Sequence, residues 1–147
     1  MKLSTRGNYG VRAVYELACN YGKGLIQIKQ ISERQEIPLK YLEQLLLRLK
    51  KSGIIESVRG PSGGYELTDD PSNLSIGTVF RVLEGPFQMS GCVQSRNKDH
   101  CGRMNNCISN ILWTQLEQRF EQVLEEISLL DLIQLGCDFV NEDMLNH

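Results

Sequence analysis

Apolar residues in the first third of the chain recur at helical spacing in three successive segments. The spacing predicts an amphipathic helix over residues 8–21 and a shorter helix over residues 28–35. A third predicted helix starts at Pro38, because proline is favoured in a first helical turn, and runs to about Ser52. Gly53 follows in the position of a left-handed helix cap. The expected core positions are Val11, Val14, Tyr15, Ala18 and Tyr21 in the first helix and Leu42, Leu45, Leu46 and Leu49 in the third.

A β-hairpin is predicted directly after the third helix, in the segment IIESVRGPSGGYEL. Residues 54–58 have the pattern of a strand, residues 60–64 that of a tight glycine-rich turn, and residues 65–67 that of a returning strand. Three helices followed by a hairpin are the order of elements in a winged helix-turn-helix DNA-binding domain. The predicted fold class is therefore mainly α with a small β-hairpin.

The second half of the chain carries a much longer helical pattern. A short helix is expected from about Leu74, with Ser75 as its N-cap, and Gly85-Pro86 ends it. Further on, an apolar stripe continues for roughly twenty residues, more than one small domain can cover, so we expect a dimerisation helix that packs on its copy in a homodimer. A final short helix is predicted over residues 128–135. The stripe consists of Ile108, Ile111, Leu112, Leu116, Phe120, Val123, Leu124 and Ile127, with Trp113 expected to anchor its packing.

Charge divides the chain into two parts. Residues 1–68 contain eleven Lys and Arg against six Glu, a net charge of +5, whereas residues 69–147 contain five against twelve Asp and Glu, a net charge of −7. A basic half suits a polyanion such as DNA, although an excess of this size also fits an ordinary solvated surface. We predict a DNA-binding domain over residues 1–70, a connecting helix and cysteine loop over 71–107, a dimerisation helix region over 108–136 and a flexible tail over 137–147.

Polar residues line the face of the third helix opposite its buried leucines. A helix fits the major groove, where Glu43 can accept a hydrogen bond from a cytosine amino group and Gln44 can pair with adenine. Lys40 and Arg48 are expected to meet phosphates, and the hairpin places Arg59 over the backbone or the minor groove. A charged helix face is by itself usually only solvated, so the prediction depends on the combination with the wing. The predicted DNA-binding residues are Lys40, Tyr41, Glu43, Gln44, Arg48 and Arg59.

Three of the five cysteines, Cys92, Cys101 and Cys107, occupy one polar loop. Thiolates are soft ligands, and three on one loop can converge on iron or zinc. The loop has no Cys-x-x-Cys pair of the kind that structural zinc sites use, so an iron–sulfur cluster is favoured over zinc. The alternative is a set of ordinary reduced thiols, which would be open to oxidation. Cys19 is expected in the core.

Composition narrows the remaining possibilities. The N-terminus lacks the apolar region of a secretion signal, and no apolar run is long enough to span a bilayer, so we expect a cytoplasmic protein with no membrane contact. An odd cysteine count in a reducing compartment indicates ligands or free thiols. The sequence has no nucleophile–base arrangement, phosphate-binding P-loop or paired carboxylates, so we do not expect an enzyme.

These motifs together resemble the family of IscR-type iron–sulfur cluster regulators, which also contains NsrR and RirA. The resemblance covers almost the whole chain: MKLSTRGNYGVRA, ISERQEIPLKYLEQLLLRLKKSGII, SVRGPSGGYEL, the three-cysteine loop and Leu112-Trp113. It implies a homodimeric winged-helix transcription regulator that binds a palindromic operator in double-stranded DNA. It also implies that Cys92, Cys101 and Cys107 are the cluster ligands, and that the cluster controls which promoters are occupied.

The sequence departs from the family pattern at the fourth cluster ligand. The gap between the first two cysteines is longer than in IscR proteins, and Asn110 stands where they have a ligand histidine. NsrR-like members use an acidic residue of the partner's first helix, where this chain has Asn8. His100, next to Cys101, is the nearest chemically suitable donor for the fourth position, and a hydroxide, a small thiol or a backbone donor is the alternative. The cluster type stays open, with 2Fe-2S favoured over 4Fe-4S.

The expected function is therefore that of a DNA-binding transcription regulator whose iron–sulfur cluster tunes promoter binding in response to cluster status. One alternative is a nitric-oxide- or iron-sensing repressor of the same family. Another is a cluster-free regulator that responds to thiol oxidation or to a small ligand. A cluster-bearing electron carrier is the alternative from another class, and it would leave the wing and the polar helix face without a role.

Overall fold

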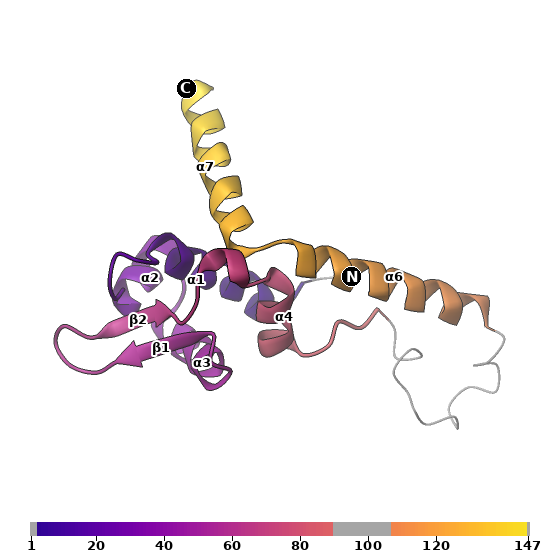
Figure 1. The fold of residues 1–147 in the computed structure, drawn as a ribbon, viewed down its shortest axis with the longest axis horizontal. Coiled ribbons are helices and arrows are strands. Elements are labelled where there is room, and N and C mark those ends of the chain that lie inside the picture. Colours follow the sequence, from indigo (N-terminus) through magenta and orange to yellow (C-terminus); the bar gives the residue numbers. More distant parts are fainter. Residues whose placement is uncertain (1–2, 90–106, 147) are drawn as a thin grey trace.

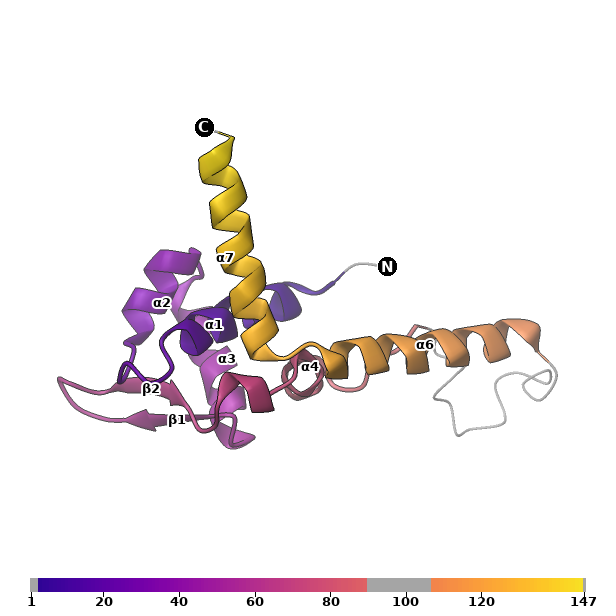
Figure 2. The same ribbon diagram turned by 45° about the horizontal axis from the view of Figure 1, so that its top comes forward.

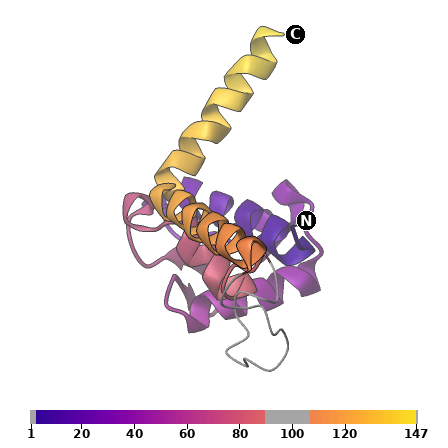
Figure 3. The same ribbon diagram turned by 90° about the vertical axis from the view of Figure 1, so that its right-hand side faces the viewer.

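The computed structural model describes residues 3–89 and 107–146 (Figure 1). A compact body holds the N-terminal helices and a two-stranded hairpin, and two long C-terminal helices leave it in different directions (Figures 1 and 2). Viewed along α6, α7 rises away from the body (Figure 3). The element order is α1 (Thr5–Cys19), α2 (Ile28–Gln35), α3 (Leu39–Lys51), β1 (Ile55–Val58), β2 (Gly64–Leu67), the 3-10 turn η1 (Pro71–Asn73), α4 (Ile76–Glu84), α6 (Ile108–Glu126) and α7 (Leu129–Leu145). The predicted fold class, mainly α with a small β-hairpin, is confirmed.

The core lies between α1, α2, α3, α4 and the hairpin. Its most buried side chains are Val14, Leu17, Ile26, Ile31, Ile37, Leu42, Leu45, Leu46, Leu49, Ile55, Leu83 and Leu129. All four leucines expected to be the buried face of α3 are in this cluster. Leu129, the first residue of α7, belongs to it as well, so the base of α7 is part of the body.

The buried face of α1 differs from the predicted stripe. Val11 is only half-buried and Tyr21 is 40% exposed, whereas Gly10 is buried. The reason is the close approach of α4, because a Cβ at Gly10 would lie 2.1 Å from Leu83 Cδ1. A glycine has no apolar side chain, so it does not count in the hydrophobic periodicity. The pattern therefore did not predict that the Gly10 face of α1 packs closely on α4.

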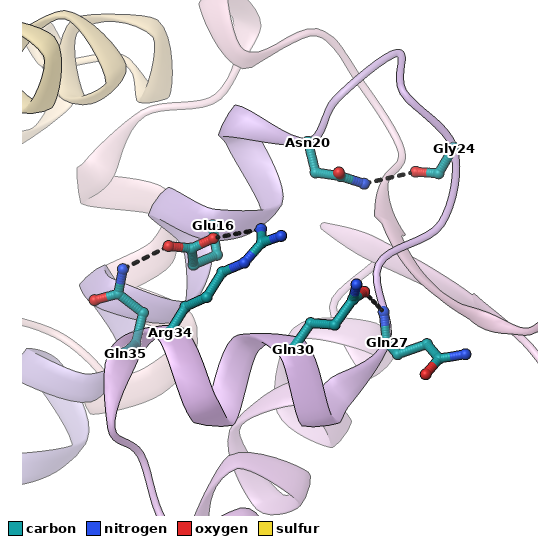
Figure 4. Close-up of polar contacts among 7 residues, drawn as sticks. All are labelled: Glu16, Asn20, Gly24, Gln27, Gln30, Arg34 and Gln35. Carbon is teal, nitrogen blue, oxygen red and sulfur yellow. Dashed lines mark hydrogen bonds and ion pairs between the residues drawn. The ribbon is translucent and has the colours of Figure 1, made fainter.

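The orientation of α2 is fixed by a carboxylate that is buried between helices. Glu16 of α1 is 8% exposed, and its two oxygens accept hydrogen bonds from Arg34 Nη1 at 3.3 Å and Gln35 Nε2 at 2.6 Å (Figure 4). Residue Glu36 then adopts a left-handed backbone, with φ of 52°, and Pro38 caps α3. The C-terminal end of α2 is therefore held to α1 directly before the chain turns into α3.

The hairpin follows α3 after Gly53, whose φ of 84° confirms the predicted left-handed cap. Strands β1 and β2 pair antiparallel, with Ile55 opposite Leu67. At the other edge of β2, Tyr65 exchanges two backbone hydrogen bonds with Ile26, at 2.9 and 3.0 Å. A Cβ at Gly64 would lie 2.6 Å from the Ile26 carbonyl oxygen, so this edge requires glycine.

The C-terminal helices correct one prediction. The pattern predicted a helix ending at residue 135 and a loose tail over 137–147, but α7 continues to Leu145. Gly136, the residue after the predicted helix end, lies against the ring of Tyr15, where a Cβ would be 2.3 Å from the hydroxyl oxygen. The glycine allows α7 to pack closely on α1. The neighbouring residues in the sequence do not indicate this role, because it depends on a tertiary contact. No helix of the described residues is long and apolar enough to cross a membrane.

Candidate nucleic-acid interface

The outer face of α3 is exposed along its whole length. Lys40, Glu43, Gln44, Leu47 and Lys51 all point away from the buried leucines. Leu47 is 52% exposed, although a leucine in this position would ordinarily be buried. The face combines cations, a hydrogen-bond acceptor, an amide and one apolar side chain, which are the groups that read base edges and thymine methyls in a major groove.

The hairpin lies beside α3 and extends past it (Figures 1 and 2). Arg59 follows β1 directly and is exposed at the tip. Gly60 has a φ of 115°, and the Gly63 N–H closes the turn onto the Gly60 carbonyl at 3.0 Å. The glycine-rich turn therefore gives the arginine a defined backbone at the end of a short ribbon.

Two of the predicted DNA-binding residues also make contacts within the protein. The Tyr41 ring is half-buried and packs edge-on against Tyr9, with ring centroids 5.3 Å apart, while the Arg12 guanidinium lies over the other ring of the pair, 5.2 Å from the Tyr9 centroid. Arg48 is exposed, and its Nη1 donates to the Leu83 carbonyl of α4 at 3.4 Å. Their contacts with DNA stay predictions, whereas their roles in seating α3 are visible.

The charges of this surface are available to a polyanion. In the described parts of the chain, the ion pairs join Arg34 to Glu16 and Arg81 to Glu125, and neither pair involves α3 or the hairpin. Lys40, Lys51 and Arg59 are therefore open to phosphate oxygens, which position a protein on DNA without specifying sequence.

The predicted cluster ligands fall mostly outside the described residues. Cys92, Cys101 and His100 lie in residues 90–106, and only Cys107 is described. Cys107 is half-buried and forms the N-cap of α6. The positive end of a helix dipole favours a thiolate over a thiol, so this position suits a metal ligand. Within the described residues, no group of three or more His, Cys, Asp or Glu side chains is placed to hold a metal ion.

The other two cysteines lie where α1 meets α7. Cys19 is half-buried beside Tyr15, and burial raises the pKa of its thiol. A hydrogen bond with Cys19 is the main reason that the pKa of Tyr15 is also raised. Cys137 is exposed on α7. Cys19 is thus partly covered, and not fully enclosed in the core as expected.

The two long helices expose most of their apolar side chains. Within α6, every residue of which is described, only Glu117 is buried. It accepts a hydrogen bond from the Met89 N–H, and Phe120 stacks on Phe87 with ring centroids 4.3 Å apart. Sequence reasoning missed Glu117, because an acidic residue in a helix has the pattern of a solvated one. The exposed apolar residues are Ile108, Ile111, Leu112, Trp113, Leu116 and Val123 in α6, and Leu130, Leu135, Phe139, Val140, Met144 and Leu145 in α7.

Comparison with known proteins decides the family. The model of the Rrf2 family, described as iron-dependent transcriptional regulators, matches residues 3–135. The chain belongs to the Rrf2 family. The protein is thus a DNA-binding transcription regulator of the Rrf2 family with the winged-helix fold. The roles of the α3 face as recognition helix and of the hairpin as wing stay predictions.

Three relatives show which members of the Rrf2 family are similar. The HTH-type transcriptional regulator IscR of Yersinia pseudotuberculosis is 37% identical over 145 residues, which cover 99% of this chain and 83% of that protein. The solved structure of T. potens IscR has a TM-score of 0.75 and 34% identity, covering 92% of this chain and 88% of that one. The structure of CymR, the global cysteine regulator of B. subtilis, has a TM-score of 0.76 and 31% identity, and the match covers 92% of this chain and 98% of that one. The fold is therefore shared by regulators whose names point to different signals.

Proposed function

We propose that this chain is a homodimeric Rrf2-family regulator that holds an iron–sulfur cluster through Cys92, Cys101 and Cys107, and that the cluster tunes its binding to promoters. The observation that carries the DNA-binding part is the exposed polar face of α3 beside the wing. Glu43 and Gln44 read base edges, Lys40 meets phosphates, and Arg59 meets the backbone or the minor groove. Cluster status is the signal that the regulator reports.

The donor chemistry supports a cluster in the cysteine segment. Cys107 is held at the N-terminus of α6, and with Cys92 and Cys101 it makes three thiolates, the ligands that iron–sulfur clusters use. His100 is our candidate for the fourth position, and a 2Fe-2S cluster is favoured over 4Fe-4S. Cys92, Cys101 and Cys107 would hold the cluster, which when bound would supply an iron- and redox-responsive group. A change at Cys107 could reach the body through α6, because Cys107 is the N-cap of α6 and α6 packs on α4.

The homodimer is supported by the uncovered apolar faces of α6 and α7. Large exposed apolar surfaces on a soluble protein indicate a partner, and two-fold symmetric self-association is the commonest form. Two recognition helices related by a two-fold axis read a palindromic operator when they lie roughly 34–36 Å apart. The relative position of the two α6 helices would therefore set the spacing of the two α3 helices.

A cluster-free regulator is the second candidate, and two observations favour it. CymR, whose fold is as similar as that of IscR, is described as a cysteine regulator. A cleft of about 570 Å³ also lies between α4 and α6, with Phe80, Phe87 and Phe120 among its lining residues. A small ligand bound there would act on the same helices. The cysteines would then be reversible thiols.

One anaerobic experiment separates the two candidates. The full chain is purified without oxygen, its visible spectrum and its iron and sulfide content are measured, and it is titrated onto a palindromic duplex selected from a random pool, before and after cluster removal. We expect iron and sulfide in equal amounts and a change of at least roughly tenfold in operator affinity, equal to about 1.4 kcal/mol. Cys101→Ala should abolish the cluster, and Cys19→Ala should leave it intact. Colourless protein with unchanged DNA affinity would favour the second candidate.

A further inference from the structure

The C-terminal end of α4 is held by arginines from two other helices. Arg6, in the first turn of α1, donates from Nη1 to the Leu83 carbonyl at 3.2 Å, and Arg48 of α3 donates from Nη1 to the same oxygen at 3.4 Å. The last carbonyls of a helix have no partner within the helix and form the negative end of its dipole, so guanidinium groups are favourable there. The Leu83 carbonyl is thus a junction of three helices, one of which is the recognition helix.

This end of α4 has little freedom to move by itself. The Leu83 side chain is 2% exposed, and it packs so close to α1 that no Cβ fits at Gly10. The neighbouring Glu84 carboxylate accepts a hydrogen bond from the hydroxyl of Ser4, the N-cap of α1. Because the core side of α4 is packed so tightly, a shift of the Leu83 carbonyl cannot be absorbed by a rearrangement within α4. Such a shift would instead be transmitted to Arg6 and Arg48, which donate to this carbonyl.

The residues that follow α4 are attached to α6. Gly85 turns the chain with a φ of 80°, and the Phe87 ring stacks on Phe120 at a centroid distance of 4.3 Å. The Met89 N–H then donates to the carboxylate of Glu117, which is 7% exposed. Contacts between described residues run without interruption from α6, through residues 85–89, to the Leu83 carbonyl and Arg48. The N-cap of the same α6 is a predicted cluster ligand.

We propose that Arg48 is a positioning residue that couples the recognition helix to α6 through the Leu83 carbonyl. The inference rests on the proposed function and deepens it, because it names the residue through which a change at the cysteine segment alters DNA reading. A displacement of residues 85–89 moves the carbonyl, Arg48 follows it, and α3 changes its tilt in the major groove. The contacts of Glu43 and Gln44 with base edges then change, while the charge of the interface stays the same.

A positioning role and a phosphate contact predict different results for Arg48→Gln. A lost phosphate contact weakens binding to every duplex alike and reduces the dependence of log affinity on log salt by about one unit. A lost positioning contact weakens binding to the selected operator and leaves a shuffled duplex of the same composition little affected. The specificity ratio and the salt dependence therefore separate the two roles.

The test is a double-mutant cycle in the full, anaerobically purified chain. Arg48→Gln is combined with Phe87→Ala, which removes the ring stack on Phe120 and so weakens the attachment of residues 85–89 to α6, leaving the Met89–Glu117 hydrogen bond and the DNA face in place. We expect each single variant to lower the ratio of operator affinity to shuffled-duplex affinity roughly fivefold or more. The ratio of the double variant should lie within about twofold of that of the single variant with the lower ratio, because the effects of interacting residues are non-additive. Arg59→Gln is the matched control: its effect should multiply with that of Phe87→Ala. Gly85→Ala replaces Phe87→Ala should the latter fail to fold.

The outcomes separate this inference from the proposed function. Effects of Arg48→Gln and Phe87→Ala that multiply within about twofold, or a unit change in salt dependence at constant specificity, would overturn the positioning role while leaving the regulator intact. Wild-type protein that prefers no duplex from the pool would instead overturn the proposed function itself. Non-additivity for Arg48 together with multiplication for Arg59 is the result that establishes the coupling.

Discussion

The body and the two C-terminal helices use apolar residues in opposite ways. In α3, Leu42, Leu46 and Leu49 have no exposed surface, whereas in α6 Ile108 is 77% exposed and in α7 Leu145 is 86% exposed. Both regions are helical and rich in leucine, so composition alone does not separate them. The difference is that the body buries its apolar side chains in its own core, while α6 and α7 leave theirs exposed, on the surface where we propose self-association. The body thus contains most of the buried core, whereas the proposed dimer surface lies on the two C-terminal helices.

The largest expected effect sharpens the body side of this comparison. Leu46→Ala should lower the free energy of unfolding by about 3 kcal/mol, because it leaves a cavity in a closed core. Its neighbour Leu47 is 52% exposed and provides the control: Leu47→Ala should change stability by less than about 0.5 kcal/mol. Urea denaturation followed by circular dichroism measures both values. Equal losses for the two variants would mean that the α3 face is packed differently from the way described.

The next effect tests the other side of the comparison. Ile111→Glu places a charge on the exposed apolar face of α6 and should weaken self-association roughly 30-fold, equal to about 2 kcal/mol, with little change in the unfolding of the monomer. Sedimentation equilibrium measures the association constant. Gln118→Glu, an exposed polar position of the same helix, is the control and should leave the dimer intact. A dimer that is unaffected by Ile111→Glu would show that α6 is not the interface.

A smaller effect is expected where the body depends on polar contacts. Glu16→Ala removes the acceptor that Arg34 and Gln35 share, and should cost about 1–2 kcal/mol of stability. Glu33→Ala, at an exposed position of α2, should have almost no effect. Thermal unfolding monitored by circular dichroism compares the two variants. If they are equally stable, α2 is held by its apolar contacts alone.

The smallest effect concerns pH and the start of α7. The Ser128 backbone N–H and hydroxyl donate to Asp131, at 2.9 and 3.0 Å, and these hydrogen bonds lower the pKa of its carboxyl group in the folded state. The stabilisation of the folded state by the Asp131 carboxylate is therefore fully present above the unfolded pKa of about 3.9. It is lost as the pH falls through the lower pKa of the folded state. Asp131→Asn should flatten the acid-induced loss of helix below about pH 4. Acid titration followed by circular dichroism, with Asp138→Asn as the control, checks this.

The sequence predicted the parts of the fold that local signals determine. Pro38 and Gly53 marked the ends of α3, and Ser75 marked the start of α4, whose Thr78 N–H it caps. The prediction failed at Gly136, because its role depends on Tyr15, a residue far away in the sequence. It also missed the buried Glu117, since no local pattern tells a solvated carboxylate from one that accepts a backbone hydrogen bond.

In the candidate site, too, the features set by local signals were predicted and those set by tertiary packing were not. Helical periodicity placed Lys40, Glu43 and Gln44 on one exposed face, because a single helix determines which residues share a face. Periodicity could not show that Arg48 would reach a carbonyl of α4, which depends on how two helices pack. For the cysteines, spacing indicated metal-ligand chemistry, and the cluster stays a prediction.

The junction between α6 and α7 has a consequence for how the chain accommodates change. The Ile76 N–H bonds to the Ile127 carbonyl and the Leu129 N–H to the Leu74 carbonyl, each at 2.8 Å, so the chain leaves and re-enters the body at one backbone clasp. The clasp therefore joins the two ends of the segment that runs from α4 to α6, and α4, at its start, is packed into the core. Lengthening a flexible loop is entropically cheap, about 0.6 kcal/mol for each doubling of its length. An insertion between Cys92 and Cys101 is therefore expected to cost the fold little stability, because the clasp keeps the two ends of the segment joined.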